Sequence, residues 1–139
     1  MSNIEAEALL RNTLRLTDDV WVTHFAHAGP EGKVEISIRG GPDKPDEAHL
    51  AEAAACIASL PDIRHRMEHT LNSVPADNPL FPAIGARSWW LEALSFVSDE
   101  PERGVAIFSL NEDGYDFIYV EYVVELERGQ VVSASARTR

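Results

Sequence analysis

The chain has 139 residues, a length that predicts one domain over residues 1–139 with a core of its own. Apolar residues make up 45% and charged residues 25% of the chain, a composition that excludes a disordered protein. Acidic residues outnumber basic ones by 23 to 12, and the net charge of −11 argues against nucleic acid and anionic membranes as partners and favours a basic protein or a cationic ligand.

The first third of the chain predicts a helix followed by a hairpin. Ile4–Leu16 has apolar residues at helical spacing and no Gly or Pro, so we expect a short N-terminal helix there. Val20–His27 is rich in β-branched and aromatic residues and predicts a strand. After a turn at residues 28–32, Lys33–Arg39 alternates apolar and polar residues and predicts a second strand that pairs with the first.

A long helix or a kinked helix pair is predicted in the middle of the chain. Pro45 followed by two acids is typical of a helix start, because proline suits the first helical position and acids suit the first turn. Apolar residues then recur on one side as far as Leu60. Pro61 interrupts the run, so either the helix kinks or a second helix begins, and the apolar stripe continues to Val74. Residues 75–87 form a long connection.

The last part of the chain predicts a four-strand meander. Its strands are expected at Trp89–Val97, Val105–Leu110, Asp116–Glu127 and Val131–Ala136. Because strands and helices do not alternate strictly, the fold class is α+β. We expect a mostly antiparallel sheet, made of the N-terminal hairpin and the meander, with the central helices on one face and the other face partly open.

The strand Asp116–Glu127 predicts a recognition surface. One of its faces is apolar and belongs to the core, whereas the other mixes aromatic rings with carboxylates. The mixed face carries Phe117, Tyr119, Glu121, Val123, Glu125 and Glu127. Trp89 and Trp90 add aromatic area, since neighbouring strand residues point to opposite faces. Rings often anchor interfaces, and carboxylates suit a Lys- or Arg-rich partner. Alternatively, helices cover this face.

The segment from His65 to His69 matches the pattern H-x-x-E-H, in which two histidines bind zinc and the glutamate acts as general base. This match gives an alternative function, a metal-dependent hydrolase built on His65, Glu68 and His69. Two observations argue against it. The histidines lie opposite the apolar stripe of their helix and should face solvent, and Arg66 would place positive charge beside the ion. We therefore expect no metal and no cofactor.

The other candidate groups indicate structure and not chemistry. His24 and His27 fall on opposite faces of their strand, so they cannot hold one ion, and His24 is expected to be buried and hydrogen-bonded. Cys56 lies mid-helix among alanines, where neither a helix N-terminus nor a cation activates it. The sequence has neither a G-x-S-x-G elbow nor a glycine-rich nucleotide fingerprint. We therefore expect that the protein is not an enzyme.

The sequence also bears on the cellular compartment. One cysteine excludes an intramolecular disulfide, and the first residues lack the basic and apolar regions of a signal peptide. No apolar run approaches the roughly 20 residues that span a bilayer. We expect a cytoplasmic protein.

The meander resembles the C-terminal half of small uncharacterised bacterial domains that recur beside polymorphic and contact-dependent toxins. The resemblance is carried by Ser88–Val97, Gly104–Leu110, Phe117–Tyr122 and Gly129–Ser133, and the Trp21 strand, hairpin and long helix fit the same layout. Such domains are taken to be immunity proteins. The resemblance implies a protein that binds and blocks a partner without chemistry of its own, and it carries over no catalytic residue.

These observations together predict a non-catalytic binding protein. Its most concrete form is an immunity-type inhibitor that occludes a basic toxin, by electrostatic steering followed by aromatic anchoring. The predicted partner-binding residues are Trp89, Phe117, Tyr119, Glu121 and Glu125. The alternatives are a small-molecule binder that uses a pocket of the sheet, and the metal-dependent hydrolase described above. A free edge strand would also allow two copies to pair as a homodimer.

Overall fold

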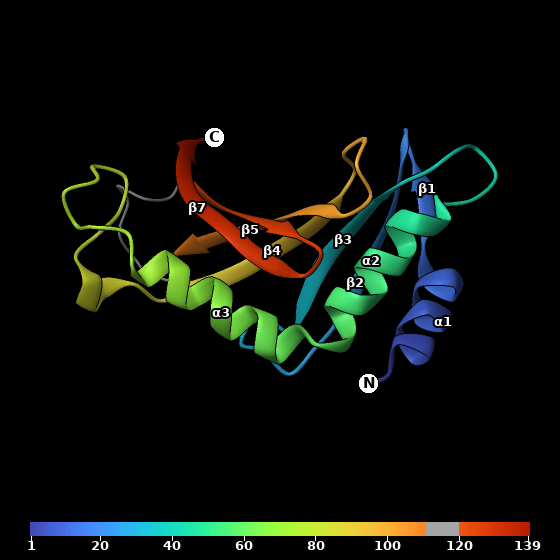
Figure 1. The fold of residues 1–139 in the computed structure, drawn as a ribbon, viewed down its shortest axis with the longest axis horizontal. Helices are drawn as coiled ribbons and strands as arrows, with labels where there is room; N and C mark the ends of the chain where they lie inside the picture. The colour runs from blue at the N-terminus through green and yellow to red at the C-terminus, as the bar shows by residue number, and fades with distance from the viewer. Residues whose placement is uncertain (111–119) are drawn as a thin grey trace.

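The fold combines helices with one large sheet in a computed structural model that describes residues 1–110 and 120–139 (Figure 1). In these residues the helices are α1 Asn3–Thr13, α2 Glu47–Ala58 and α3 Leu60–Asn72, with a short 3₁₀ helix at Ile84–Ala86. The strands are β1 Arg15–Thr17, β2 Val20–Ala26, β3 Lys33–Arg39, β4 Trp89–Phe96, β5 Arg103–Leu110, β6 Val120–Glu127 and β7 Gln130–Thr138.

All seven described strands lie in one sheet, and their order in the sheet is their order in the chain. Each neighbouring pair is antiparallel except β3 and β4, which run parallel with Ile36 beside Leu94 and Ser37 beside Ser95. This one parallel pair joins the N-terminal strands to the C-terminal meander, and the helices supply the long crossover that a parallel connection needs.

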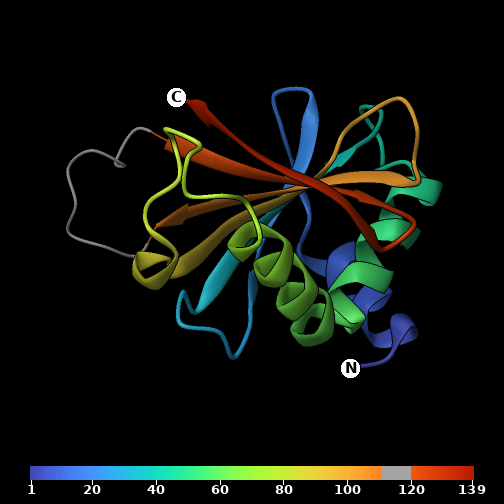
Figure 2. The ribbon, with the colours of Figure 1, turned by 60° about the vertical axis from the view of Figure 1, so that its left-hand side comes forward.

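The helices cover one face of the sheet, as Figures 1 and 2 show. Helix α2 contacts β3 and β4, α3 contacts β6 and β7, and α1 packs against α2. The alternating apolar residues of β3 and β6 meet the buried stripes of α2 and α3 to form the core. Its largest fully buried side chains include Leu10, Leu50, Met67, Phe108 and Tyr122.

Local chemistry explains where several elements begin and end. The hydroxyl of Ser2 accepts a hydrogen bond from the N–H of Glu5 and caps α1. Pro61 occupies the first turn of α3, so the interruption in the apolar stripe marks a second helix and not a kink within one. Arg128 and Gly129 both have positive φ, at 51° and 75°, and form the tight turn between β6 and β7.

The α+β class and the mostly antiparallel sheet are confirmed, but the described residues form seven strands where six were expected. The expected helix over Ile4–Leu16 is too long. The chain becomes extended at Leu14, and Arg15–Thr17 pairs with β2 as a short strand. No helix of the described residues is long and apolar enough to cross a membrane.

Candidate functional site

The face of the sheet opposite the helices is the first candidate surface, because no helix in residues 1–110 or 120–139 packs on it. Across its centre Ala93 pairs with Ile107, Ile107 with Val123, and Val123 with Ser135. These side chains are small or apolar, and Val123 is only 8% exposed although no helix covers it. We call this surface the open face. It offers a flat, weakly polar centre to any partner.

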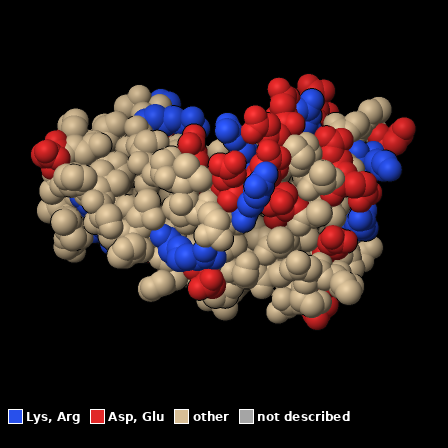
Figure 3. Space-filling model, viewed as in Figure 1, with Lys and Arg blue, Asp and Glu red and all other residues tan. Residues whose placement is uncertain are grey.

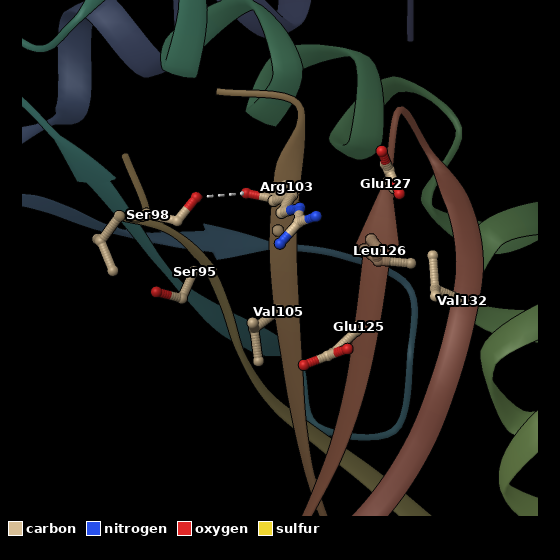
Figure 4. Close-up of a pocket in the computed structure, with 10 residues that line it drawn as sticks. Ser95, Ser98, Arg103, Val105, Glu125, Leu126, Glu127 and Val132 are labelled. Atoms are coloured by element: carbon tan, nitrogen blue, oxygen red, sulfur yellow. Dashed lines mark hydrogen bonds between the residues drawn. The ribbon is translucent and has the colours of Figure 1, made fainter. Parts of the chain in front are cut away.

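A hollow of about 380 Å³ lies on the open face between β4, β5, β6 and the start of β7 (Figure 4). Figure 4 shows the carboxylate of Glu125 beside Val105, its cross-strand neighbour. Two partly exposed valines, Val97 (42%) and Val132 (57%), belong to the same hollow. The hydroxyl of Ser133 donates to Glu125 at 3.1 Å and holds the carboxylate in place. We call this hollow the Glu125 pocket.

Valine walls around one carboxylate suit a particular kind of guest. A lysine or arginine side chain could lay its aliphatic stem against the valines and bring its charged end to Glu125. Arg103 also borders the pocket, but its Nε lies 2.8 Å from Glu100 and its charge is balanced there. Glu127 adds a second carboxylate to the lining. The pocket therefore favours a cation attached to an apolar stem.

Acidic residues gather at the end of the sheet where the β1–β2 turn, the loop before α2, the β4–β5 loop and the β6–β7 turn lie. In Figure 3 the red atoms concentrate at the upper right, over the loops that Figure 1 places near β1 and the start of α2. We call this region the acidic end. Its carboxylates belong to Asp18, Asp19, Asp43, Asp46, Glu47, Asp99, Glu100, Glu102 and Glu127.

Fewer basic residues lie at the acidic end, namely Arg39, Lys44, Arg103 and Arg128. Two of them, Arg39 and Arg103, already pair with carboxylates. The guanidinium of Arg39 contacts the carboxylates of Asp46 and Asp99 and ties two loops together. The segment 70–86 at the other end carries Asp77 as its only charged residue. The described residues of the acidic end thus carry nine carboxylates against four basic side chains, at the end of the molecule where the Glu125 pocket opens.

The structure separates the residues that were predicted to bind a partner. Glu125 lies in the pocket. Glu121 sits on the same face of β6 but forms an ion pair with Arg137 at 2.8 Å, so its charge is balanced. Phe117 and Tyr119 lie outside the described residues, and their part in binding stays a prediction.

Trp89 does not belong to the surface, which corrects the expectation drawn from the sequence. It alternates with Leu91 on the helix side of β4 and is only 4% exposed. Its ring packs edge-to-face on Tyr122 at 4.9 Å, and its Nε1 donates to the side chain of Asn72 at 2.8 Å. The half-buried Trp90 points to the open face instead, because neighbouring strand residues face opposite sides.

The H-x-x-E-H segment has the exposure that its helical spacing predicts. His65 and His69 are exposed on α3, while the carboxylate of Glu68 lies 3.4 Å from Arg64. Among residues 1–110 and 120–139, no group of three or more His, Cys, Asp and Glu is placed to hold a metal ion. Burial raises the pKa of Cys56 to about 12, which keeps its thiol protonated and unreactive.

A buried ionic cluster holds the β2–β3 turn against α3 and β4, and the sequence did not reveal it. The carboxylate of Glu31, 1% exposed, accepts two hydrogen bonds from Arg64 at 2.6 Å and one from the N–H of Leu91 at 2.6 Å. Burial by itself raises the pKa of Glu31, but these hydrogen bonds outweigh it and leave the pKa below its ordinary value.

His27 completes this cluster. Its Nδ1 accepts a hydrogen bond from the N–H of Gly29, so the neutral ring carries its proton on Nε2, which lies 3.4 Å from Glu31. His24, in contrast, is 62% exposed on the open face, so the expectation of a buried His24 is wrong. The histidine of this hairpin that is sheltered from solvent is His27, whose side chain is 9% exposed.

A cleft of about 920 Å³, larger than the Glu125 pocket, opens beside the same cluster, at the end of the sheet opposite the acidic end. Its walls come from the end of β2, the junction of α2 and α3, and the segment before β4. Apolar and aromatic residues alternate with polar ones along it, including Phe25, His27, Ile57, Arg64, Asn72 and Arg87. We call it the His27 cleft.

No family model, curated protein or solved structure matches this chain. Its function therefore has to be inferred from the geometry of its own surfaces.

Proposed function

We propose that this chain is a binding protein for a basic protein partner, and that a lysine or arginine side chain of the partner enters the Glu125 pocket. The observation that carries the proposal is the position of this pocket: a carboxylate between valines, on the open face of the sheet, at the end where the acidic residues gather. Long-range attraction to the acidic end would orient the partner, and the pocket would then fix its register.

An immunity-type inhibitor of a basic toxin is the form of this function that we favour. A net charge of −11 suits a partner whose own surface is basic. The flat centre of the open face suits a protein surface better than a small molecule, because it offers area without enclosure. Inhibition would consist of occluding the toxin's active site, and it would need no reaction on either side.

The pocket can be tested with short peptides before the partner is known. An arginine-containing peptide, added to isotope-labelled protein, should shift the amide resonances of Ser95, Val105 and Val132. The same peptide with citrulline in place of arginine should not, because it keeps the shape and loses the charge. The variant Glu125→Gln should weaken the arginine peptide by about tenfold, whereas Glu7→Gln on α1 should have no effect.

Two outcomes would remove the pocket from the proposal. One is equal shifts with the arginine and citrulline peptides, and the other is unchanged affinity in Glu125→Gln. The inhibitor reading has its own test: the genes that flank this one are expressed singly, and a product that stops growth is then produced together with the chain. Wild type should restore growth to cells that make that protein, and Glu125→Gln should restore less.

The His27 cleft favours a second candidate function, the binding of a small molecule. Its volume of about 920 Å³ and its mixture of rings and polar groups are typical of ligand sites. The dye anilinonaphthalene sulfonate should fluoresce with wild type and lose its signal with Ala58→Trp, which fills the cleft. Ala51→Trp, on the exposed side of α2, serves as the control. Equal fluorescence in both variants would refute this candidate.

A further inference from the structure

The two edges of the sheet differ in a way that indicates an interaction surface. At one edge, β1 has only three residues, and the guanidinium of Arg15 folds back to donate to the carbonyls of Asn12 and Leu14. At the other edge, β7 has nine residues and pairs only with β6 among the described strands. Within that part of the chain, no backbone hydrogen bond outside the β6–β7 ladder involves residues 130–138.

Strand β7 lacks two of the residue types by which natural edge strands avoid pairing. It contains neither proline nor lysine, and its middle consists of small residues, Ser133 to Ala136. Its one charged side chain, Arg137, is held by Glu121. Helix α3 packs against the inner face of β7 and does not replace a strand beside it. A nine-residue edge whose outer backbone groups are unpaired within the described residues is a template for another strand.

We propose that β7 pairs with β7 of a second copy of this chain, antiparallel about a two-fold axis, so that one sheet runs through both copies. Antiparallel pairing brings the start of one β7 beside the end of the other. The start follows Glu125 and Glu127 at the acidic end, whereas the far end carries Arg137 and Arg139. Both arginines contact carboxylates of their own chain, Glu121 and Glu92, but the Arg137 side chain is 64% exposed, and an exposed ion pair exchanges partners at little cost. Because of the two-fold axis, the acidic start of each β7 lies beside the basic end of the other. A parallel arrangement would not bring these opposite charges together.

Val132 adds an apolar contribution to the same edge. A register shift between β6 and β7 leaves it opposite no residue of β6, and it is 57% exposed. A second β7 beside it would shelter this side chain from water, and Val132 is the most exposed large apolar residue of the described strands. The edge thus offers backbone groups, complementary charges and an exposed valine to the same occupant.

The test measures the mass of the full-length chain in solution and compares two matched variants. Wild type should sediment as a dimer at about 100 µM, where a dimer of micromolar Kd is mostly assembled. Val132→Lys should sediment as a monomer, because a lysine on an edge strand opposes pairing. Val97→Lys has the same substitution at a partly exposed valine of the same face, but Val97 lies directly after β4, an inner strand, so this variant should remain dimeric.

Amide hydrogen exchange provides a second measurement that needs no variant. Protection of the amides of β7 should rise with protein concentration, while protection of β3, in the middle of the sheet, should stay constant. A monomer at every concentration would overturn the proposal, as would a dimer in which Val132→Lys and Val97→Lys behave alike. Val97 and Val132 both border the Glu125 pocket, so both variants should disturb peptide binding there, whereas only Val132→Lys should dissociate the dimer.

Discussion

Replacing Glu31 by alanine should destabilise the protein more than any other removal of a described surface or turn carboxylate. Glu31 lies in the turn between β2 and β3, yet its carboxylate joins three parts of the chain through Arg64 and Leu91. The substitution Glu31→Ala removes all three hydrogen bonds. It also leaves the guanidinium of Arg64 without its counter-ion in a site where the arginine side chain is only 13% exposed.

The size of the effect follows from this burial. Removing one partner of a buried ion pair costs about 3–5 kcal/mol, because the other charge stays out of water unpaired. Arg64 keeps the carbonyl of Trp89 at 3.2 Å and Glu68 at 3.4 Å, so we expect the lower figure, about 3 kcal/mol. For a chain of 139 residues this corresponds to a midpoint of thermal unfolding lowered by about 10 °C.

The chain contains its own control for this experiment. Arg11 and Glu47 form a second two-pronged pair, with contacts of 3.0 and 2.7 Å, but both side chains are about half exposed. Glu47→Ala should leave the midpoint nearly unchanged, because water and salt screen that pair. The midpoints of both variants can be compared by circular dichroism or scanning calorimetry at pH 7.

The double variant Glu31→Ala with Arg64→Ala distinguishes the free-energy cost of an unpaired buried charge from the cost of the lost hydrogen bonds. It should lose less stability than the sum of the two single variants, because it leaves no buried charge without a partner. If Glu31→Ala and Glu47→Ala shift the midpoint equally, burial does not decide the strength of these pairs and the reasoning is wrong.

Three further predictions concern Glu31, Gly104 and Cys56. Since the pKa of Glu31 is lowered in the fold, its contribution is complete above the ordinary value of 4.5 and is lost as pH falls through the folded value, so acid should destabilise wild type more steeply than Glu31→Ala. Gly104→Ala should cost about 1–3 kcal/mol, because its Cβ would lie 2.6 Å from the Phe96 ring, whereas Gly41→Ala meets no atom within 4 Å; chemical denaturation compares them. Cys56, with its raised pKa, should react with a thiol reagent only as fast as the protein unfolds.

Local patterns were sufficient to predict the elements whose neighbours lie close in sequence. Lys33–Arg39 alternates at period two and has the predicted bounds in the structure. Pro61 marked a helix boundary, because proline fits the first turn and opposes the interior. The short strand β1 was missed because its three residues follow α1 directly and have no alternation long enough to detect.

The predictions that failed concern side chains whose positions depend on contacts with distant parts of the chain. Nothing in the sequence near Trp89 decides which of two adjacent tryptophans faces the helices, and Phe81 and Tyr122 determine the outcome by packing around it. Glu31 stands in a Gly-Pro-Glu-Gly turn, where an acid usually meets water, and only the approach of Arg64 buries it. The Glu125 pocket was half predicted, since alternation placed Glu125 correctly but gave no sign of Val97 and Val132.

The parallel ladder between β3 and β4 makes the two halves of the chain depend on each other. A proteolytic cut between Val74 and Asn78 would leave one fragment with β1 to β3 and another with β4 to β7. Each fragment would then expose, as an edge, a strand that is paired on both sides in the intact sheet. Ile36 of β3 and Leu94 of β4 are both 0% exposed and lie side by side at this junction. Each would be exposed to water once its fragment is separated from the other. Separate production of the halves should give aggregates, and only their joint refolding should restore a native sheet.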